Sequence, residues 1–180
     1  MQNEAKLLSQ LKFDDSKELA FKTLIKRYKE NLYWHIRKIV ISHDDADDVL
    51  QNTFVKVFKN IDKFNGDSKL YTWMYRIATN ESITFLNSKA RRNKVSNETL
   101  NENALQNLVT YVYFDGDEIQ LKLQKAIAQL PRIQQLVFNM RYFDNIKYRD
   151  MSVILETSEG ALKASYHIAV KKIKTYLIDH

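Results

Sequence analysis

The chain of 180 residues contains only three glycines and one proline. Average usage of roughly 7% and 5% would give about thirteen and nine in a chain of this length. β-Sandwiches, β-barrels and glycine-rich phosphate loops need glycine at backbone angles that other residues avoid. So few turn-forming residues therefore favour a chain built from helices.

Composition narrows the class further. With 44% apolar and 28% charged residues the chain is typical of globular proteins. Because it has no cysteine, disulfides, thiolate catalysis and cysteine-ligated zinc are excluded. The first residues lack the basic and apolar segments of a signal peptide, and no run of about eighteen apolar residues could cross a membrane. We therefore expect a soluble, cytoplasmic chain without membrane insertion.

Charge is distributed unevenly along the chain, whose net charge is +6. Residues 1–95 hold 18 basic against 12 acidic side chains, and residues 96–120 hold five acids and no base. Residues 121–180 again hold more bases than acids, ten against five. This pattern is typical of two modules that each approach a polyanion, joined by a connector that avoids it. A mildly basic protein with a solvated linker is the plainer alternative.

Apolar residues recur every three or four positions, which is the pattern of amphipathic helices. Ser42 and the acids after it suit the N-cap and first turn of a helix, and Pro131 suits the first turn of another. We predict helices at about 16–41, 42–61, 69–90, 118–129, 131–140, 147–155 and 159–177. The Asn-rich residues from 93 to 107 are predicted to be part of a linker.

The end of the chain has the length pattern of a helix-turn-helix: a short helix, a three-residue break and a longer helix. In the last helix, Leu162, Tyr166, Ala169, Ile173 and Leu177 would form the core face. The opposite face would carry Lys163, His167, Lys171 and Lys174. Such a helix is anchored by its apolar side and presents donors to base edges and phosphates. An ordinary amphipathic surface helix would show the same pattern.

Residues 45–86 carry the most specific motifs, an Asp-Ala-Asp-Asp run, a Phe-x-Gly-x-Ser turn and a Trp-Met-Tyr-Arg-Ile-Ala-x-Asn helix. Together they closely resemble the core-binding and promoter-melting domain of bacterial sigma factors of the extracytoplasmic-function (ECF) group. The matching positions are Asp45, Ala46, Asp47, Asp48, Val49, Gln51, Phe54, Phe64, Gly66, Ser68, Thr72, Trp73, Met74, Tyr75, Arg76, Ile77, Ala78 and Asn80. Residues 118–178 resemble the second domain of the same family, which binds the −35 promoter element.

The resemblance implies an all-α fold with two small helical domains joined by a flexible acidic linker. Residues 1–95 would be sigma region 2, which binds core polymerase and recognises and melts the −10 element. Residues 96–117 would be the acidic linker, in the RNA-exit path of the polymerase. Residues 118–180 would be region 4, a helix-turn-helix that recognises the −35 element. The implied protein directs promoter-specific transcription initiation, is not an enzyme, and has no catalytic residue, metal or cofactor.

The implied core-binding residues lie on the helix that follows the acidic run, where acceptors stand beside an apolar patch. They are Asp47, Asp48, Leu50, Gln51 and Phe54. The family contacts the clamp coiled coil and the flap of the polymerase. The acids could also serve as simple helix caps. A third reading, an aspartate-rich magnesium site, would need a second carboxylate cluster across a pocket, and none is apparent in the sequence.

The loop at 63–69 and the helix after it would engage the −10 element as single-stranded DNA, by stacking bases on aromatic rings and pairing phosphates with basic groups. The implied residues are Phe64, Asn65, Lys69, Tyr71, Arg76, Asn80, Arg91 and Arg92. Trp73 shares a helix face with Ile77, which favours a core position. Tyr71 and Phe64 are therefore the better stacking candidates.

The implied −35 contacts are Arg149, Lys163, Ala164, His167 and Lys171. The sequence departs from the family here, because Ile168 stands where an arginine is common. Fewer bidentate donors weaken direct reading of guanine. We therefore expect an A/T-rich element that is read partly through groove shape, or an unusual one.

The implied partners are core RNA polymerase, promoter DNA and an anti-sigma factor, which can hold a sigma factor at the membrane. The expected location is the cytoplasm, at the nucleoid. A stand-alone helix-turn-helix regulator is the main alternative and would bind duplex DNA specifically without polymerase. A second alternative is a helical protein whose basic faces contact acidic proteins.

Overall fold

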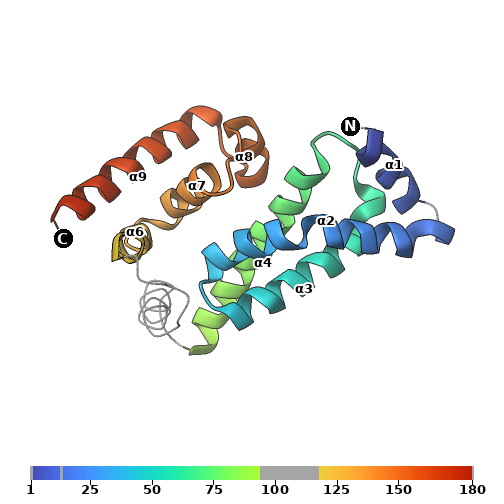
Figure 1. The fold of residues 1–180 in the computed structure, drawn as a ribbon, viewed down its shortest axis with the longest axis horizontal. Coiled ribbons are helices and arrows are strands. Elements are labelled where there is room, and N and C mark those ends of the chain that lie inside the picture. The colour runs from blue at the N-terminus through green and yellow to red at the C-terminus, as the bar shows by residue number, and fades with distance from the viewer. Residues whose placement is uncertain (1, 13, 94–117, 180) are drawn as a thin grey trace.

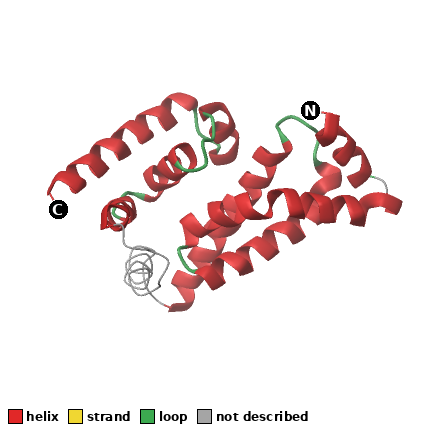
Figure 2. Cartoon of the chain, viewed as in Figure 1, coloured by secondary structure: helices red, strands yellow, loops and turns green. Residues whose placement is uncertain are grey.

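The computed structural model describes residues 2–12, 14–93 and 118–179. Within these ranges all regular structure is helical and no strand occurs (Figure 2). The predicted all-α fold is confirmed. The acidic linker predicted at 96–117 lies outside the described residues. No described helix has the length and apolar character needed to cross a bilayer.

The first half of the chain forms α1 (Gln2–Leu11), α2 (Asp14–Val40), α3 (His43–Asn60), a 3-10 turn η1 (Ile61–Lys63) and α4 (Leu70–Asn93). Helix α1, which buries Leu7 and Leu11, was not predicted from the sequence. As predicted, Ser42 is the N-cap of α3, and its side chain accepts a hydrogen bond from the amide of Asp45. The turn before α4 contains Gly66 at φ 82°, where glycine avoids steric strain.

The second half forms α6 (Glu118–Ala128), α7 (Arg132–Tyr142), α8 (Tyr148–Leu155) and α9 (Glu159–Asp179). Pro131, predicted in the first turn of a helix, is instead the N-cap of α7, one position before the helix begins. A left-handed residue, Glu156 at φ 52°, ends α8 and turns the chain into α9. These two helices and the short turn between them form the predicted helix-turn-helix (Figure 1).

In the first half, α2, α3 and α4 pack on one another, with α1 against α2. Their core includes Leu24, Leu32 and Ile36 of α2, all fully buried. In the second half, α9 packs across α6, α7 and α8. A separate small apolar cluster joins α6, α7 and α9 around Ile127 and Phe138. Each half therefore contains the helical bundle that the sequence predicts.

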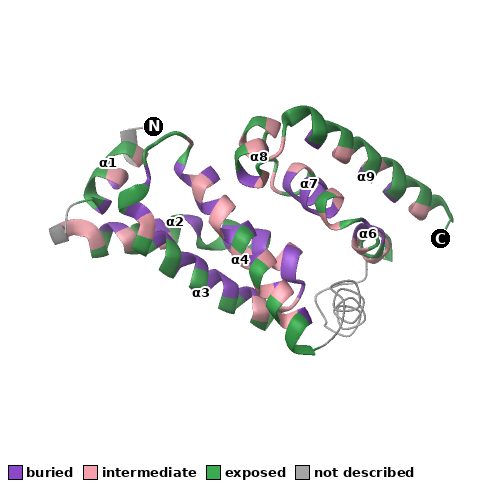
Figure 3. Ribbon diagram, turned by 180° about the vertical axis from the view of Figure 1, so that it is seen from behind, coloured by how far each residue is buried: buried purple, intermediate pink, exposed green. Residues whose placement is uncertain are grey.

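The two halves also pack directly on each other, which the sequence did not predict. Helix α8 lies against α4, and α7 lies against α2 (Figure 1). Met140, Met151 and Ile154 of the second half are buried in the same apolar cluster as the core of the first half. Figure 3 shows the resulting burial along α7 and α4, whereas the outer side of α9 is exposed along most of its length.

Candidate nucleic-acid interface

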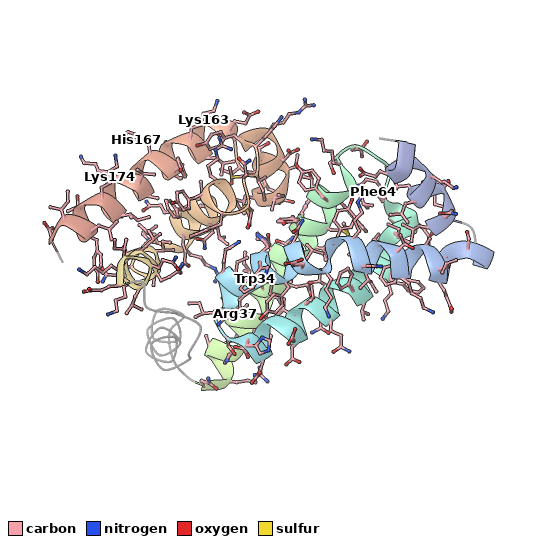
Figure 4. All side chains as sticks on the ribbon, in the orientation of Figure 1. Trp34, Arg37, Phe64, Lys163, His167 and Lys174 are labelled. Atoms are coloured by element: carbon pink, nitrogen blue, oxygen red, sulfur yellow. The ribbon has the colours of Figure 1, made fainter. Side chains whose placement is uncertain are left out.

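The outer face of α9 is a row of exposed donors. Lys163, His167 and Lys171 are all exposed and follow one another at four-residue intervals. Figure 4 shows Lys163, His167 and Lys174 on the side of α9 that faces away from α7. From Lys163 to Lys171 the row spans about 12 Å along the helix axis, similar to the width of the major groove of B-DNA. Such a face can contact phosphates and base edges together.

Buried contacts fix the orientation of this face. Leu162 and Ala169 are fully buried on the inner side of α9 and Ile173 is nearly so, as predicted. At the start of the helix, the amide of Ala161 donates to the hydroxyl of Ser158 at 3.3 Å. The −35 candidates therefore project outward from a helix that cannot rotate without exposing its core side.

The remaining −35 candidates are also on the surface. Arg149 is exposed on α8, and Ala164 is exposed between the lysines of α9. Ile168, the departure from the family pattern, is 45% exposed. The outer face of α9 thus combines basic donors with small and branched apolar groups.

The structure divides the core-binding candidates on α3 into two groups. Asp47, Asp48 and Gln51 are exposed, as a docking surface requires. Leu50 and Phe54 are buried at 4% and 8% exposure, so the predicted apolar patch is not on the surface. These two side chains face the helical core because they lie on the same stripe as the other core residues of α3. Both positions are corrections to the sequence analysis.

The apolar side chains that α3 does present are Val55 and Phe58, 45% and 37% exposed. Phe58 packs at its edge against Phe21, with ring centroids 4.9 Å apart, and lies beneath the ammonium of Lys17. Neither residue was among the core-binding candidates predicted from the sequence. Their spacing could have identified them, because they lie off the helix face formed by Val49, Leu50, Phe54 and Val57. An apolar side chain outside the buried face of a helix is exposed to solvent or to a partner.

The acids of α3 do not form a metal site. Asp45 pairs with Lys89 of α4, and Asp47 lies 3.7 Å from His43 in the preceding turn. In the part of the chain that the structure describes, no group of three His, Cys, Asp or Glu side chains could hold a metal ion. The aspartate-rich magnesium site considered from the sequence has no counterpart there.

The aromatic candidates for the −10 element differ in accessibility. Phe64 is only 5% exposed and packs against Trp73, with ring centroids 5.3 Å apart. Its ring is therefore a core group here and offers no open face to a base, which corrects its choice as a stacking candidate. Trp73 is half-buried against the same core, as expected. Tyr71 is also half-buried, and the ammonium of Lys69 lies 5.5 Å from the centre of its ring.

The polar −10 candidates form a surface along α4 and the preceding loop. Asn65 and Lys69 are exposed in the loop, and Asn80 is exposed on the helix. Arg91 and Arg92 are exposed in its last turn. Arg76 is partly exposed near the middle of the helix.

Two of these candidates are bound by the second half of the chain. The hydroxyl of Tyr71 donates to the carboxylate of Asp150, and Arg76 pairs with Glu156. Burial, together with the hydrogen bond to Asp150, raises the pKa of Tyr71 to about 12. The structure thus joins part of the predicted −10 surface to the helix-turn-helix.

A buried polar cluster lies at the same junction. Asp144, which follows α7, accepts from the ring of His35 at 2.8 Å and pairs with Lys38. Its side chain is 6% exposed. Burial acts to raise the pKa of Asp144, but the hydrogen bond and charge of His35, with those of Lys38, outweigh burial and lower this pKa below 3.8. The carboxylate is therefore ionised and shared by two donors of α2.

Comparison with known proteins connects both halves to one family. Residues 24–92 match the family model described as Sigma-70 region 2, and residues 120–173 match Sigma-70, region 4. The chain is 27% identical to the RNA polymerase sigma-H factor of Pseudomonas aeruginosa over 161 residues, covering 81% of this chain and 79% of the relative. It is 28% identical to the ECF RNA polymerase sigma-E factor of Escherichia coli over 158 residues, covering 81% and 80%.

Solved structures share the fold. The sigma factor RpoE of Bartonella quintana, in complex with the anti-sigma factor NepR, matches with a TM-score of 0.68 and 19% identity, over 87% of this chain and 96% of that one. CnrH, in complex with the cytosolic domain of CnrY, matches with a TM-score of 0.70 and 19% identity, over 98% and 97%. The presence of region 2 before region 4 does not favour a stand-alone helix-turn-helix regulator. The chain belongs to the sigma-70 family, as a sigma factor of RNA polymerase in the ECF group.

Proposed function

We propose that this sigma factor binds core RNA polymerase through α3, recognises the −35 element through α9, and recognises and melts the −10 element through α4 and the loop before it. The observation that carries the proposal is the presence, on one chain, of the two sigma-70 regions and of an exposed basic face on α9. This division assigns residues 1–95 to region 2, 96–117 to the linker and 118–180 to region 4. The action needs neither a cofactor nor hydrolysis.

The proposed core-binding surface is the exposed side of α3. Asp47, Asp48 and Gln51 supply acceptors, and Val55 and Phe58 supply the apolar area next to them. Protein interfaces combine a small apolar centre with a polar rim, and a few central side chains provide most of the affinity. Val55 and Phe58 replace the buried Leu50 and Phe54 in this role.

The proposed −35 contact combines charge and shape. Lys163 and Lys171 would meet phosphates, with His167 between them over the groove. The exposed methyl groups of Ala164 and Ile168 suit contact with the methyl group of thymine. Because α9 offers no arginine for bidentate pairing with guanine, an A/T-rich element suits this face.

The proposed −10 surface acts on an opened strand. Extruded bases regain stacking energy on aromatic rings, and the backbone meets basic side chains. Tyr71 is the proposed stacking residue, Asn65 and Asn80 the proposed readers of base edges, and Lys69 and Arg76 the proposed phosphate contacts. Arg91 and Arg92 extend the basic surface along α4.

An anti-sigma factor is a further proposed partner. Support comes from two structures of similar fold, whose sigma factors were solved in complex with NepR and with the cytosolic domain of CnrY. The proposed place of action is the cytoplasm, at the nucleoid. The anti-sigma factor could hold the sigma factor at a membrane.

Paired measurements on separate variants test the assignment of surfaces. Substituting Lys163→Glu and Lys171→Glu should weaken binding of the holoenzyme to −35 duplex DNA while co-purification with core polymerase persists. Substituting Asp48→Ala and Phe58→Ala should abolish co-purification while leaving the helical circular dichroism unchanged. Equal loss of both activities in both variants would contradict the proposed division.

A further inference from the structure

A row of basic side chains runs along the exposed side of α2. Its members are Lys22, Lys26, Lys29 and Arg37, and Tyr33 occupies the position in the row between Lys29 and Arg37. Successive positions are three or four residues apart, which keeps the five side chains on one side of the helix. The row is about 22 Å long, because its ends are 15 positions apart in the sequence. The three lysines are exposed, and Arg37 is half-buried.

The charges of this row are not neutralised by acids of the chain. None of the four bases has an ion-pair partner in the part of the chain that the structure describes. Between residues 22 and 37 the sequence has five bases and a single acid, Glu30. Other lysines of the same half do have acidic partners, namely Lys17 with Asp62, Lys56 with Glu81, and Lys89 with Asp45. The row is therefore a local positive field that attracts a polyanion.

A partly open aromatic ring lies beside the end of the row. Trp34 is 48% exposed, although tryptophan is highly buried on average. Its ring packs edge-on against Tyr33, with ring centroids 5.2 Å apart. The hydroxyl oxygen of Tyr33 in turn lies 2.6 Å from Nδ1 of His43, at the start of α3. Tyr33 thus supports the ring of Trp34 next to Arg37, three residues along the helix (Figure 4).

The middle of the row borders a shallow hollow. Its volume is about 400 Å³, and it is lined by Lys26, Lys29, Glu30 and Tyr33. Two ammonium groups and one aromatic ring therefore face the same space. Because Glu30 is the only acid among the lining residues, the hollow favours an anionic occupant.

These features together favour a single nucleic-acid strand as the partner. Spaced lysines contact the phosphates of a backbone without reading its sequence. An open tryptophan ring stacks on a base that is unpaired and accessible. A duplex could use the lysines, but its bases are already stacked on one another and offer no free face to Trp34.

We propose that the outer side of α2 is a separate site for single-stranded nucleic acid, where Lys22, Lys26, Lys29 and Arg37 contact phosphates and Trp34 stacks on a base. The site binds without sequence preference, because its contacts are to the backbone and to the face of a base. It does not depend on the proposed −10 surface, which lies on α4 and the loop before it.

The salt dependence of binding tests the lysines. The full chain is titrated against a fluorescent 20-nucleotide oligo(dT). The variant K22Q/K26Q/K29Q should make the slope of log affinity against log salt concentration less steep by about 2, since each phosphate contact on a single strand contributes about 0.7. The control K6Q/K12Q/K125Q removes three exposed lysines elsewhere and should keep the parent slope. Equal slopes for the two variants would overturn the proposal.

Substitution of Trp34 tests the stacking contact. W34A should weaken binding of oligo(dT) by about 5- to 150-fold, the equivalent of the 1–3 kcal/mol that stacking contributes per base. Its salt slope should equal that of the parent, because no charge is removed. W34F keeps a ring and should retain most of the affinity. If W34A binds as tightly as the parent chain, Trp34 stacks on no base and the single-strand assignment is wrong.

A variant that gains affinity separates the proposal from a loss of structure. E30Q removes the acid that lines the hollow and should bind oligo(dT) more tightly than the parent, which damage to the fold could not produce. Equal or weaker binding by E30Q would contradict a phosphate in the hollow.

Further probes identify the occupant. The affinities of the parent chain for oligo(dT) and for oligo(U) of the same length show whether the strand is DNA or RNA. Variants of α2 that lose co-purification with core polymerase but keep their affinity for both oligonucleotides would show that the row contacts a protein, and the proposal would be wrong. Y71A/R76A tests α4 separately: full oligonucleotide binding by this variant would count against the proposed −10 surface and leave the α2 site standing.

Discussion

Replacing Asp144 with asparagine removes the charge of the buried cluster and keeps its shape. The amide oxygen can still accept from His35, so the change replaces a charged acceptor with a neutral one. Hydrogen bonds to a charged group contribute about 1.5–3 kcal/mol and neutral ones about 0.5–1.5 kcal/mol. Asp144 has two such partners, His35 and Lys38, and its side chain is 6% exposed. We expect a loss of about 2 kcal/mol in the free energy of unfolding.

For a chain of this length that loss corresponds to a fall in Tm of about 4–8 °C. The measurement is thermal unfolding at pH 6 followed by circular dichroism, with Asp179→Asn, an exposed acid at the end of α9, as the control. The control should change Tm by less than about 2 °C.

The pH dependence of this difference has a definite sign. The pKa of Asp144 is lower in the folded chain than its ordinary value of 3.8. Its stabilising contribution is therefore present above pH 4 and is lost as the pH falls through the folded pKa. The gap between the parent chain and Asp144→Asn should shrink below pH 4. A gap that is absent at pH 6, or that widens in acid, would refute the assignment of a shared buried carboxylate.

Three further results are expected. Single substitutions Lys163→Ala and Lys171→Ala should each reduce the slope of log affinity for −35 duplex DNA against log salt concentration by about 0.9. The slope is measured by fluorescence anisotropy of the holoenzyme. An unchanged slope would show that the substituted lysine does not contact a phosphate. Leu50→Ala should lower the free energy of unfolding by about 2–5 kcal/mol in urea titrations because the side chain is buried. Val55→Ala should change the free energy of unfolding by less than about 0.5 kcal/mol and should instead weaken binding to core polymerase. The reverse result would support the predicted surface patch that contains Leu50. Gly66→Ala should cost about 1 kcal/mol or more in the same titration, since alanine is strained at φ 82°, and no loss would show that this turn rearranges.

Local patterns predicted most of the helices because their causes are local. Ser42 caps α3, and the three- and four-residue spacing that buries Leu162 and Ala169 also exposes Lys163 and His167. The left-handed turn at Glu156 lies within the short break that the sequence placed between two helices. Each of these features depends on residues within one or two helical turns.

The candidate sites were harder to predict where one helix carries apolar residues on two faces. On α3 the helical spacing places Phe54 on one side with Val49, Leu50 and Val57, and Phe58 off that side, but only the packing of α2 and α4 shows which side is buried. Phe64 was predicted to be accessible since it lies in a loop, but Trp73 from α4 covers its ring.

The junction between the halves left no signal in the sequence. Asp144 is 109 residues from His35, and Glu156 is 80 residues from Arg76. Pairs so far apart follow no periodicity, and each acid alone is a typical surface residue of a short turn. Only the packing of α8 on α4 brings them together.

Transcription in vitro is the most direct test of a promoter-specificity role. The assay combines the purified chain with core RNA polymerase from the same bacterium and a fragmented genomic template. The 5′ ends of the transcripts are then mapped. We predict discrete new start sites that depend on the chain and whose aligned upstream sequences share an element near −10 and an A/T-rich element near −35. No chain-dependent transcripts, together with no co-migration of the chain with core polymerase, would contradict the role.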